Sequence, residues 1–158
     1  MILAAFLALQ PLPTQIPNPG FEQELTDWRS DGHRGFRAGT NEGPGGRWLT
    51  AGWAARNAAP PGARYSITTR VGAAPYRGRR IRISTATRLP DFAQGAVTLF
   101  ATAGISENSV QPRASTAWRR HGFVLSVSSR ADDMELGFIL EGTRGQLDAD
   151  DIRIEVVR

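Results

Sequence analysis

Apolar and polar residues alternate through most of the chain beyond residue 60. Apolar or β-branched residues recur at every second position within 65–71, 81–89, 97–101, 123–127 and 134–140, and polar or small residues mostly fill the positions between them. This period of two is typical of β-strands with one buried face, and no window has the spacing of an amphipathic helix. With further segments around Phe21, Phe36 and 48–53, the pattern predicts an all-β domain of about eight or nine strands. We expect these strands to form a two-sheet antiparallel jelly-roll sandwich.

The alternation slips once, close to the C-terminus. Leu147 and Ala149 share one phase, whereas Ile152, Ile154 and Val156 share the opposite phase. A one-residue slip is the signature of a β-bulge, and it falls at Asp150 and Asp151, where two adjacent carboxylates repel each other. A cation, backbone N–H donors or arginine side chains would each relieve that repulsion.

Length and composition indicate one domain and argue against nucleic acid as a partner. The chain has 158 residues with 17 Gly and 10 Pro, which suits a fold of many strands and turns. It has no cysteine, so disulfides and thiolate metal sites are excluded. The net charge is +4, and every basic residue is arginine, but the arginines are scattered among 15 acidic residues rather than clustered.

The first residues resemble a secretory leader. Ile2 to Leu9 form an uninterrupted apolar run of signal-peptide length, too short to span a bilayer, and no second apolar segment could act as a membrane span. We therefore divide the chain into a signal peptide or lead-in over 1–15 and a β-sandwich domain over 16–158, and we expect a periplasmic or secreted protein. A buried first strand or a mis-assigned start codon is the alternative explanation of the run.

Short motifs at both ends and in the middle carry a family resemblance. The start contains Asn-Pro-Gly-Phe-Glu at 18–22 followed by Trp28, and the end contains Asp150 and Asp151 leading into the closing strand 152–157. Between them lie a Tyr-Arg-Gly strand entry at 76–78 and Trp118 five residues before Phe123. Together these motifs resemble the carbohydrate-binding modules of families four, nine and twenty-two, in the galactose-binding-like superfamily. The resemblance implies a jelly roll with Trp28 and Trp118 in its core.

The same resemblance implies a structural calcium ion near the two ends of the domain. Carried over, the ligands are Glu22, the Gly20 carbonyl and a carboxylate of the last strand, Asp151. Calcium takes six to eight oxygen ligands, so further carbonyls and water would complete such a site. Without a cation, Asp150 and Asp151 would hydrogen-bond to neighbouring loops and arginines instead.

Glycan binding requires exposed rings for sugar faces and planar polar groups for hydroxyls. We nominate Trp53, Phe100 and Arg82 as ligand-binding residues. Phe100 and Ile139 fall on the outward phase of strands whose other phase is apolar, which indicates either a ligand face or a face covered by another segment. One departure from the family is Asp148, because relatives often carry an aromatic residue there.

Catalysis finds little support in the sequence. There are two histidines, His33 and His121, and no nucleophile elbow, zinc-binding helix motif or phosphate-binding glycine loop. We therefore expect no enzyme and no catalytic residues, but an exported, non-catalytic module that binds polysaccharide or glycan. The alternative is a structural or protein-interaction sandwich that has lost sugar binding.

Overall fold

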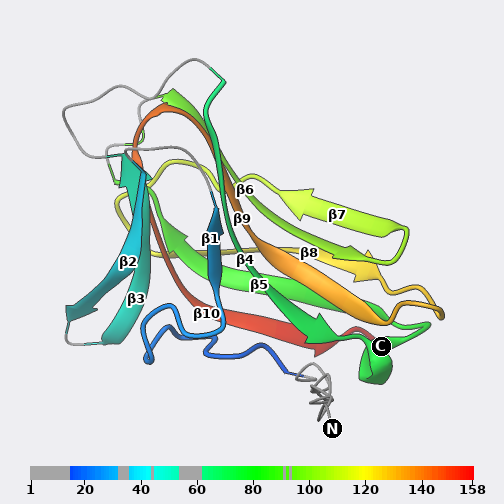
Figure 1. Ribbon diagram of the computed structural model, residues 1–158. Helices are drawn as coiled ribbons and strands as arrows, with labels where there is room; N and C mark the ends of the chain where they lie inside the picture. Colours follow the sequence, from blue (N-terminus) through cyan, green and yellow to red (C-terminus); the bar gives the residue numbers. More distant parts are fainter. Residues whose placement is uncertain (1–14, 32–35, 44, 54–61, 91, 93) are drawn as a thin grey trace, which may run out of the picture.

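The computed structural model describes residues 15–31, 36–43, 45–53, 62–90, 92 and 94–158, and the side chains of residues 36, 37, 53, 143 and 144 lie outside this description. This part of the chain is all β, as the alternation predicted, with one short 3-10 turn (Figure 1). The elements are β1 (Arg29–Asp31), β2 (Phe36–Gly43), β3 (Gly46–Trp53), β4 (Arg64–Gly72), η1 (Ala74–Tyr76), β5 (Arg80–Arg88), β6 (Gln94–Ala103), β7 (Ser106–Val110), β8 (Arg119–Ser126), β9 (Asp133–Arg144) and β10 (Gln146–Val156).

Two antiparallel sheets of five strands each form the sandwich. The front sheet has the order β1-β4-β9-β6-β7, and the back sheet has the order β2-β3-β10-β5-β8. The central strands of the two sheets, β9 and β10, are consecutive in the chain and are separated by Gly145 alone. In Figure 1 the orange ribbon of β9 arches over the top of the molecule and descends as the red ribbon of β10. One continuous stretch therefore supplies the middle of both sheets.

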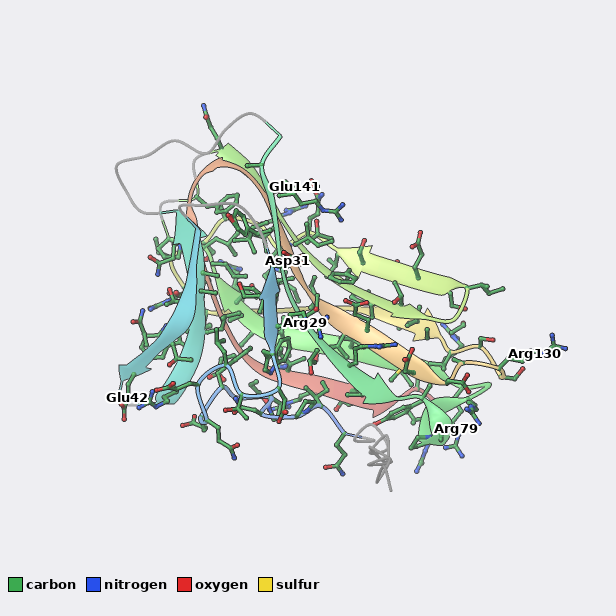
Figure 2. All side chains as sticks on the ribbon, in the orientation of Figure 1. Arg29, Asp31, Glu42, Arg79, Arg130 and Glu141 are labelled. Atoms are coloured by element: carbon green, nitrogen blue, oxygen red, sulfur yellow. The ribbon has the colours of Figure 1, made fainter. Side chains whose placement is uncertain are left out.

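The core lies between the sheets and consists mainly of the inward phase of β3, β4, β5, β6, β8, β9 and β10. Tyr65, Ile83, Leu99 and Phe138 are at most 1% exposed, as the alternation predicted. Their burial from water, at about 25 cal/mol per Å² of apolar surface, is the main term that holds the sheets together. The labelled side chains of Glu42, Arg79 and Arg130 lie at the periphery of the molecule, away from this layer (Figure 2).

The N-terminal motif closes the edge of the core, but it is not a strand. Residues 16–22 form consecutive turns, in which Asn18 and Phe21 have φ of 45° and 56°. The expected strand there is therefore wrong, because Pro17 and Pro19 cannot donate to a ladder and the following residues take left-handed conformations. The ring of Phe21 is buried against that of Trp28 at 5.0 Å, so the predicted core position of Trp28 is confirmed.

The two motifs at the chain ends do meet, as the resemblance implied. The backbone N–H of Ile152 donates to the Pro19 carbonyl at 3.0 Å. The predicted bulge is also confirmed, because the register between β10 and β5 shifts between Asp150 and Arg153, and Asp151 has φ of 49°. The bulge thus faces the N-terminal turns.

The described residues contain ten strands, slightly more than the expected eight or nine. The two additional strands are β1, which has three exposed residues, and β7, which contains no buried residue. Both lie at edges of the front sheet, where no apolar phase is needed. In the part of the chain that the structure describes, no helix is long and apolar enough to cross a membrane.

Candidate functional site

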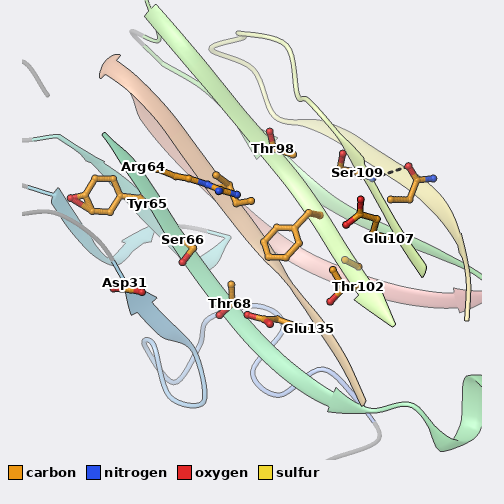
Figure 3. Close-up of a pocket in the computed structure, with 14 residues that line it drawn as sticks. Asp31, Arg64, Tyr65, Ser66, Thr68, Thr98, Thr102, Glu107, Ser109 and Glu135 are labelled. Carbon is orange, nitrogen blue, oxygen red and sulfur yellow. Dashed lines mark hydrogen bonds between the residues drawn. The ribbon is translucent and has the colours of Figure 1, made fainter. Parts of the chain in front are cut away.

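The outer face of the front sheet is hollowed into a groove of about 740 Å³ (Figure 3). We call it the front groove. Its floor is built from β4, β9 and β6, and β7 and β1 supply its sides. The lining residues are Asp31, Arg64, Tyr65, Ser66, Thr68, Thr98, Phe100, Ala101, Thr102, Glu107, Asn108, Ser109, Glu135 and Ile139.

Strand register brings one aromatic ring to the middle of this floor. Phe100 of β6 pairs with Gly137 of β9 on one side and with Ser109 of β7 on the other. Gly137 has no side chain, and a Cβ there would come within 2.0 Å of the Ile67 carbonyl oxygen. The half-buried ring of Phe100 therefore has a bare backbone on one side and a small hydroxyl residue on the other, which leaves it accessible from the groove.

Hydroxyl groups and carboxylates surround the ring. Thr98 and Thr102 flank Phe100 along β6, and Thr68 lies beyond Gly137 on β4. The carboxylates of the lining are Asp31, Glu107 and Glu135, and the one guanidinium among the lining residues is that of Arg64, whose Nε lies 3.5 Å from Oε1 of Glu141. The lining therefore carries more negative than positive charge.

The amide of Asn108 is already engaged in holding the groove wall. Its Nδ2 donates to the Val124 carbonyl of β8 at 2.8 Å, and its Oδ1 accepts from the Ser109 N–H at 2.8 Å. This side chain thus fixes edge strand β7 of the front sheet against edge strand β8 of the back sheet.

The three ligand residues nominated from the sequence do not converge. Phe100 lies in the front groove. Arg82 lies on β5 of the back sheet, is exposed, and pairs with Glu155 and Val124, so it is on the opposite side of the molecule. Trp53 ends β3, where it pairs with Phe36, and its side chain lies outside the described residues.

Groove residues that the sequence did not single out share the outward phase with Phe100. Glu135 lies four residues from Ile139, on the same face of β9, and the alternation of β9 could have identified it. Glu107 belongs to β7, whose residues Ser-Glu-Asn-Ser-Val have no apolar phase, so periodicity could not have found it.

A second aromatic cluster lies on the outer face of the back sheet. The Arg88 guanidinium carbon lies 5.2 Å from the Trp48 ring centroid and 5.0 Å from that of Trp118, and the two indoles meet edge to face at 6.1 Å. Trp118 is 40% exposed, so its predicted core position is wrong. It precedes β8 rather than standing in the inward phase of that strand, and it covers Arg88 from outside.

This stack covers a carboxylate that has no contact with solvent. Asp148 is 0% exposed, Nε of Arg88 donates to its Oδ2 at 2.7 Å, and Nε2 of Gln146 donates to its Oδ1 at 2.7 Å. Nε1 of Trp48 is buried without a hydrogen-bond partner among the described residues. We interpret the cluster as a small outer core that shields the Arg88–Asp148 ion pair.

The carboxylates of the bulge point to different partners. Asp151 binds the guanidiniums of Arg120 and Arg153, and Nε of Arg153 lies 2.9 Å from its Oδ1. The hydrogen bond from Arg153 holds the pKa of Asp151 below its ordinary value, and Arg120 acts in the same direction. Burial raises the pKa of Asp150, and the negative charges of Asp151 and Glu22 add to the increase.

Glu22 and Asp150 approach each other beside Gly20. A Cβ at Gly20 would lie 3.6 Å from Oδ1 of Asp150 and 4.0 Å from Oε1 of Glu22. Oε1 of Glu22 also accepts the Arg47 N–H at 3.1 Å, and Oδ1 of Asp150 accepts the Asp151 N–H at 2.6 Å. Among the described residues, no group of three or more acidic or histidine side chains has the geometry of a metal site.

The histidines and one pair of adjacent carboxylates have structural contacts where they are described. Asp132 and Asp133 form ion pairs with Arg77 and Arg70, and Nδ1 of His121 lies 3.0 Å from the Thr87 hydroxyl. His33 lies outside the described residues.

Several solved structures that share this fold are carbohydrate-binding modules. A family 61 module in complex with β-1,4-galactotriose superposes with a TM-score of 0.69 at 15% identity, over 91% of this chain and 99% of that one. A family 4 carbohydrate-binding module has a TM-score of 0.62 at 17% identity, over 90% and 99% of the two chains. The enzymatically active domain of tailspike protein 4 of bacteriophage CBA120 reaches 0.70 at 10% identity, over 91% of this chain and 21% of that one.

No family model and no curated protein matches the sequence. The likeness therefore concerns the fold: the chain has the jelly roll of carbohydrate-binding modules.

Proposed function

We propose, on the basis of this carbohydrate-binding-module-like jelly roll, that the protein is a non-catalytic module that binds a polysaccharide or glycan in the front groove. The observation that carries the proposal is the accessible ring of Phe100 in the middle of a long groove rich in hydroxyl groups. Sugar rings have an apolar C–H face and an edge of hydroxyls, so they suit an aromatic ring surrounded by hydrogen-bonding side chains.

The shape of the groove supports a chain ligand rather than a compact one. It extends across all five strands of the front sheet, from Asp31 on β1 to Glu107 on β7. The bare backbone at Gly137 leaves room for a sugar ring beside Phe100. Thr68, Thr98 and Thr102 can then donate to or accept from its hydroxyls.

Four carboxylates outside the front groove have contacts that fit a non-catalytic role. Asp132, Asp133, Asp148 and Asp151 are each bound by arginine, which leaves them poorly placed for proton transfer.

We also propose a periplasmic or secreted location, which rests on the apolar run from Ile2 to Leu9. That run lies outside the described residues. N-terminal sequencing of the protein from its native host should find a mature chain that begins between Gln10 and Ile16. An intact Met1 on abundant cytoplasmic protein would contradict export.

A structural calcium ion is a further part of the proposal. Glu22 and Asp150 supply two carboxylates beside Gly20, whose carbonyl would be a third oxygen donor. Oxygen donors of this kind fit calcium. Asp151, nominated by the family resemblance, is occupied by two guanidiniums, so Asp150 replaces it in the proposed ligand set.

The alternative, a protein-interaction domain, is favoured by one observation, the 40% exposure of Trp118 on the back sheet. Exposed tryptophans are common in protein interfaces. The two candidate functions use opposite faces of the molecule, so paired variants can separate them.

The test compares Phe100→Ala with Trp118→Ala in polysaccharide retention and in stability. The Phe100→Ala variant should no longer be retained on insoluble polysaccharides, whereas the Trp118→Ala variant should be retained as well as the parent protein. Because the Phe100 ring is only half-buried, its removal should cost less than the roughly 3–5 kcal/mol typical of a core phenylalanine. A parent protein that retains no glycan on an array or a polysaccharide panel would sink the proposal and leave the interaction-domain alternative.

A further inference from the structure

The front groove has a charge opposite to that of the chain that contains it. The protein has a net charge of +4, yet three carboxylates and a single guanidinium line the groove. That guanidinium, of Arg64, is close to a fourth carboxylate, that of Glu141, at 3.5 Å. The groove therefore presents a local negative potential on a basic protein.

The three groove carboxylates differ from many others in having no guanidinium partner among the residues that the structure describes. Seven described carboxylates lie within 4.0 Å of an arginine side chain; they are Glu24, Glu42, Asp132, Asp133, Glu141, Asp148 and Asp151. Asp31, Glu107 and Glu135 form no such pair with a described residue. Their charges are available to a ligand.

Hydrogen-bonding capacity in the groove is weighted toward acceptors. A carboxylate accepts and does not donate, and the amide of Asn108 is used by the Val124 carbonyl and the Ser109 N–H. Arg64, the strongest donor in the lining, is shared with Glu141. A donor-rich ligand is therefore the better match for this groove.

Two of the carboxylates lie on either side of Thr102, two residues along β6 from the aromatic ring. Glu135 on β9 and Glu107 on β7 both pair with Thr102, which is two residues along β6 from Phe100. Neighbouring strands are about 4.8 Å apart, so the backbones that carry the two glutamates are about 10 Å apart. Measured along β6, Thr102 and its two partners lie about 7 Å from Phe100. A glycan that continues along β6 from a sugar stacked on Phe100 would bring its adjacent unit to the two carboxylates beside Thr102.

We propose that the front groove selects a glycan that carries free amino groups, with an ammonium group bound between Glu107 and Glu135 while a neighbouring ring stacks on Phe100. An ammonium group has three donors and no acceptor, so it complements carboxylates that lack a partner. This inference rests on the proposed glycan-binding function and adds the chemical class of the ligand.

The test measures binding of two oligosaccharides of equal length by titration calorimetry in mildly acidic, low-salt buffer. One is a β-1,4-linked glucosamine oligomer and the other is the fully N-acetylated oligomer. The amine oligomer should bind about tenfold more tightly, because two partly exposed ion pairs each contribute modestly, and this preference should shrink at high salt.

The double variant Glu107→Gln/Glu135→Gln should lose the preference while keeping its melting temperature, since both side chains reach solvent. Glu155→Gln, which removes an exposed carboxylate of the back sheet, is the matched control and should keep it. Phe100→Ala should weaken binding of both oligomers.

The remaining outcomes separate the two proposals. Equal affinity for the two oligomers, or tighter binding of the acetylated one, would overturn the amine inference and leave the glycan-binding function standing. An amine preference that persists in the double variant would also overturn the inference, because the charge would then act from elsewhere. Binding of neither oligomer, nor of any neutral polysaccharide, would overturn both.

Discussion

A single guanidinium, that of Arg88, neutralises a carboxylate that has no exposure to solvent. Arg88 lies against two indole rings and donates to Asp148, and its own side chain is only 31% exposed. Breaking a buried ion pair by removing one partner leaves an uncompensated charge, which is far more costly than replacing both partners together.

We therefore expect Arg88→Met to destabilise the fold by about 3 kcal/mol, measured by urea unfolding. The double variant Arg88→Met/Asp148→Leu should recover much of that loss, because it leaves no buried charge. If the losses in unfolding free energy of the two single variants simply add in the double variant, the indole packing rather than the ion pair holds the cluster together.

The ion pairs of Asp151 predict a pH dependence with a definite sign. Its pKa is lowered in the folded state, chiefly by the hydrogen bond from Arg153, so its ionised form is favoured by folding. The associated stability is present above the unfolded-state pKa of aspartate and is lost as pH falls through the lower folded-state pKa.

Asp151→Asn should therefore be less stable than the parent at neutral pH, and the difference should disappear in acid. Unfolding by urea at a series of pH values measures this directly. Asp150 contributes to the pH dependence with the opposite sign, because burial raises its pKa. The effect of Asp151 is therefore the difference in unfolding free energy between parent and variant at each pH. A difference independent of pH would contradict the assignment.

The sequence could not have predicted how the aromatic residues divide between core and surface. Trp28 and Trp118 occupy comparable motif positions, yet the first is 7% exposed and the second 40%. What separates them is the partner of each: Phe21 packs on Trp28 inside, whereas Arg88 brings Trp118 to the outer face to cover Asp148. That arrangement depends on a contact across strands, which no local pattern encodes.

The bulge of β10 and the N-terminal turns form one unit, because the Ile152 N–H bonds to the Pro19 carbonyl. Glu22 and Asp150 approach each other within this unit. Two carboxylates that lie close together repel each other, which opposes folding unless a cation or hydrogen-bond donors compensate their charges.

Chelation should therefore lower the melting temperature if calcium binds here, since an ion bound only by the folded state adds RT ln(1 + [L]/Kd) to its stability. Glu22→Gln/Asp150→Asn should abolish the response to chelator. Asp132→Asn, a 94% exposed carboxylate remote from the unit, is the control and should respond like the parent. Identical melting of metal-free and calcium-loaded parent protein would leave hydrogen bonds as the sole compensation.

Periodicity identified the elements well but could not assign them to a sheet. It predicted which residues of β5 and β6 face inward, and those side chains are buried. It could not tell that β5 belongs to the back sheet and β6 to the front sheet, because both strands alternate in the same way. The alternation therefore allows Arg82 and Phe100 to be assigned to one ligand site, although the core separates them. The phase slip at the bulge was predictable because β10 keeps a buried phase on both sides of it.

The connection between the two sheets depends on one residue. Gly145 lies between β9 and β10 with φ of 147°, and a Cβ there would meet Cδ2 of Phe92 at 2.1 Å. Because Phe92 packs against the core, it has little freedom to move aside.

Gly145→Ala should therefore destabilise the whole domain by about 2 kcal/mol or more, because a left-handed backbone and a steric clash act together. Gly39→Ala in β2 is the control, since a Cβ there meets nothing within 4 Å, and it should leave stability nearly unchanged. Thermal unfolding of both variants tests the prediction, and equal melting temperatures would contradict it.

The central positions of β9 and β10 also constrain the order in which the sandwich can form. Residues 133–156 form the middle strand of each sheet, and they follow the other eight described strands in the chain. Without this segment β4 and β6 have no common neighbour, nor do β3 and β5, so neither sheet can close. Completion of both sheets therefore waits for one stretch of 24 residues, whichever of the other strands pair first.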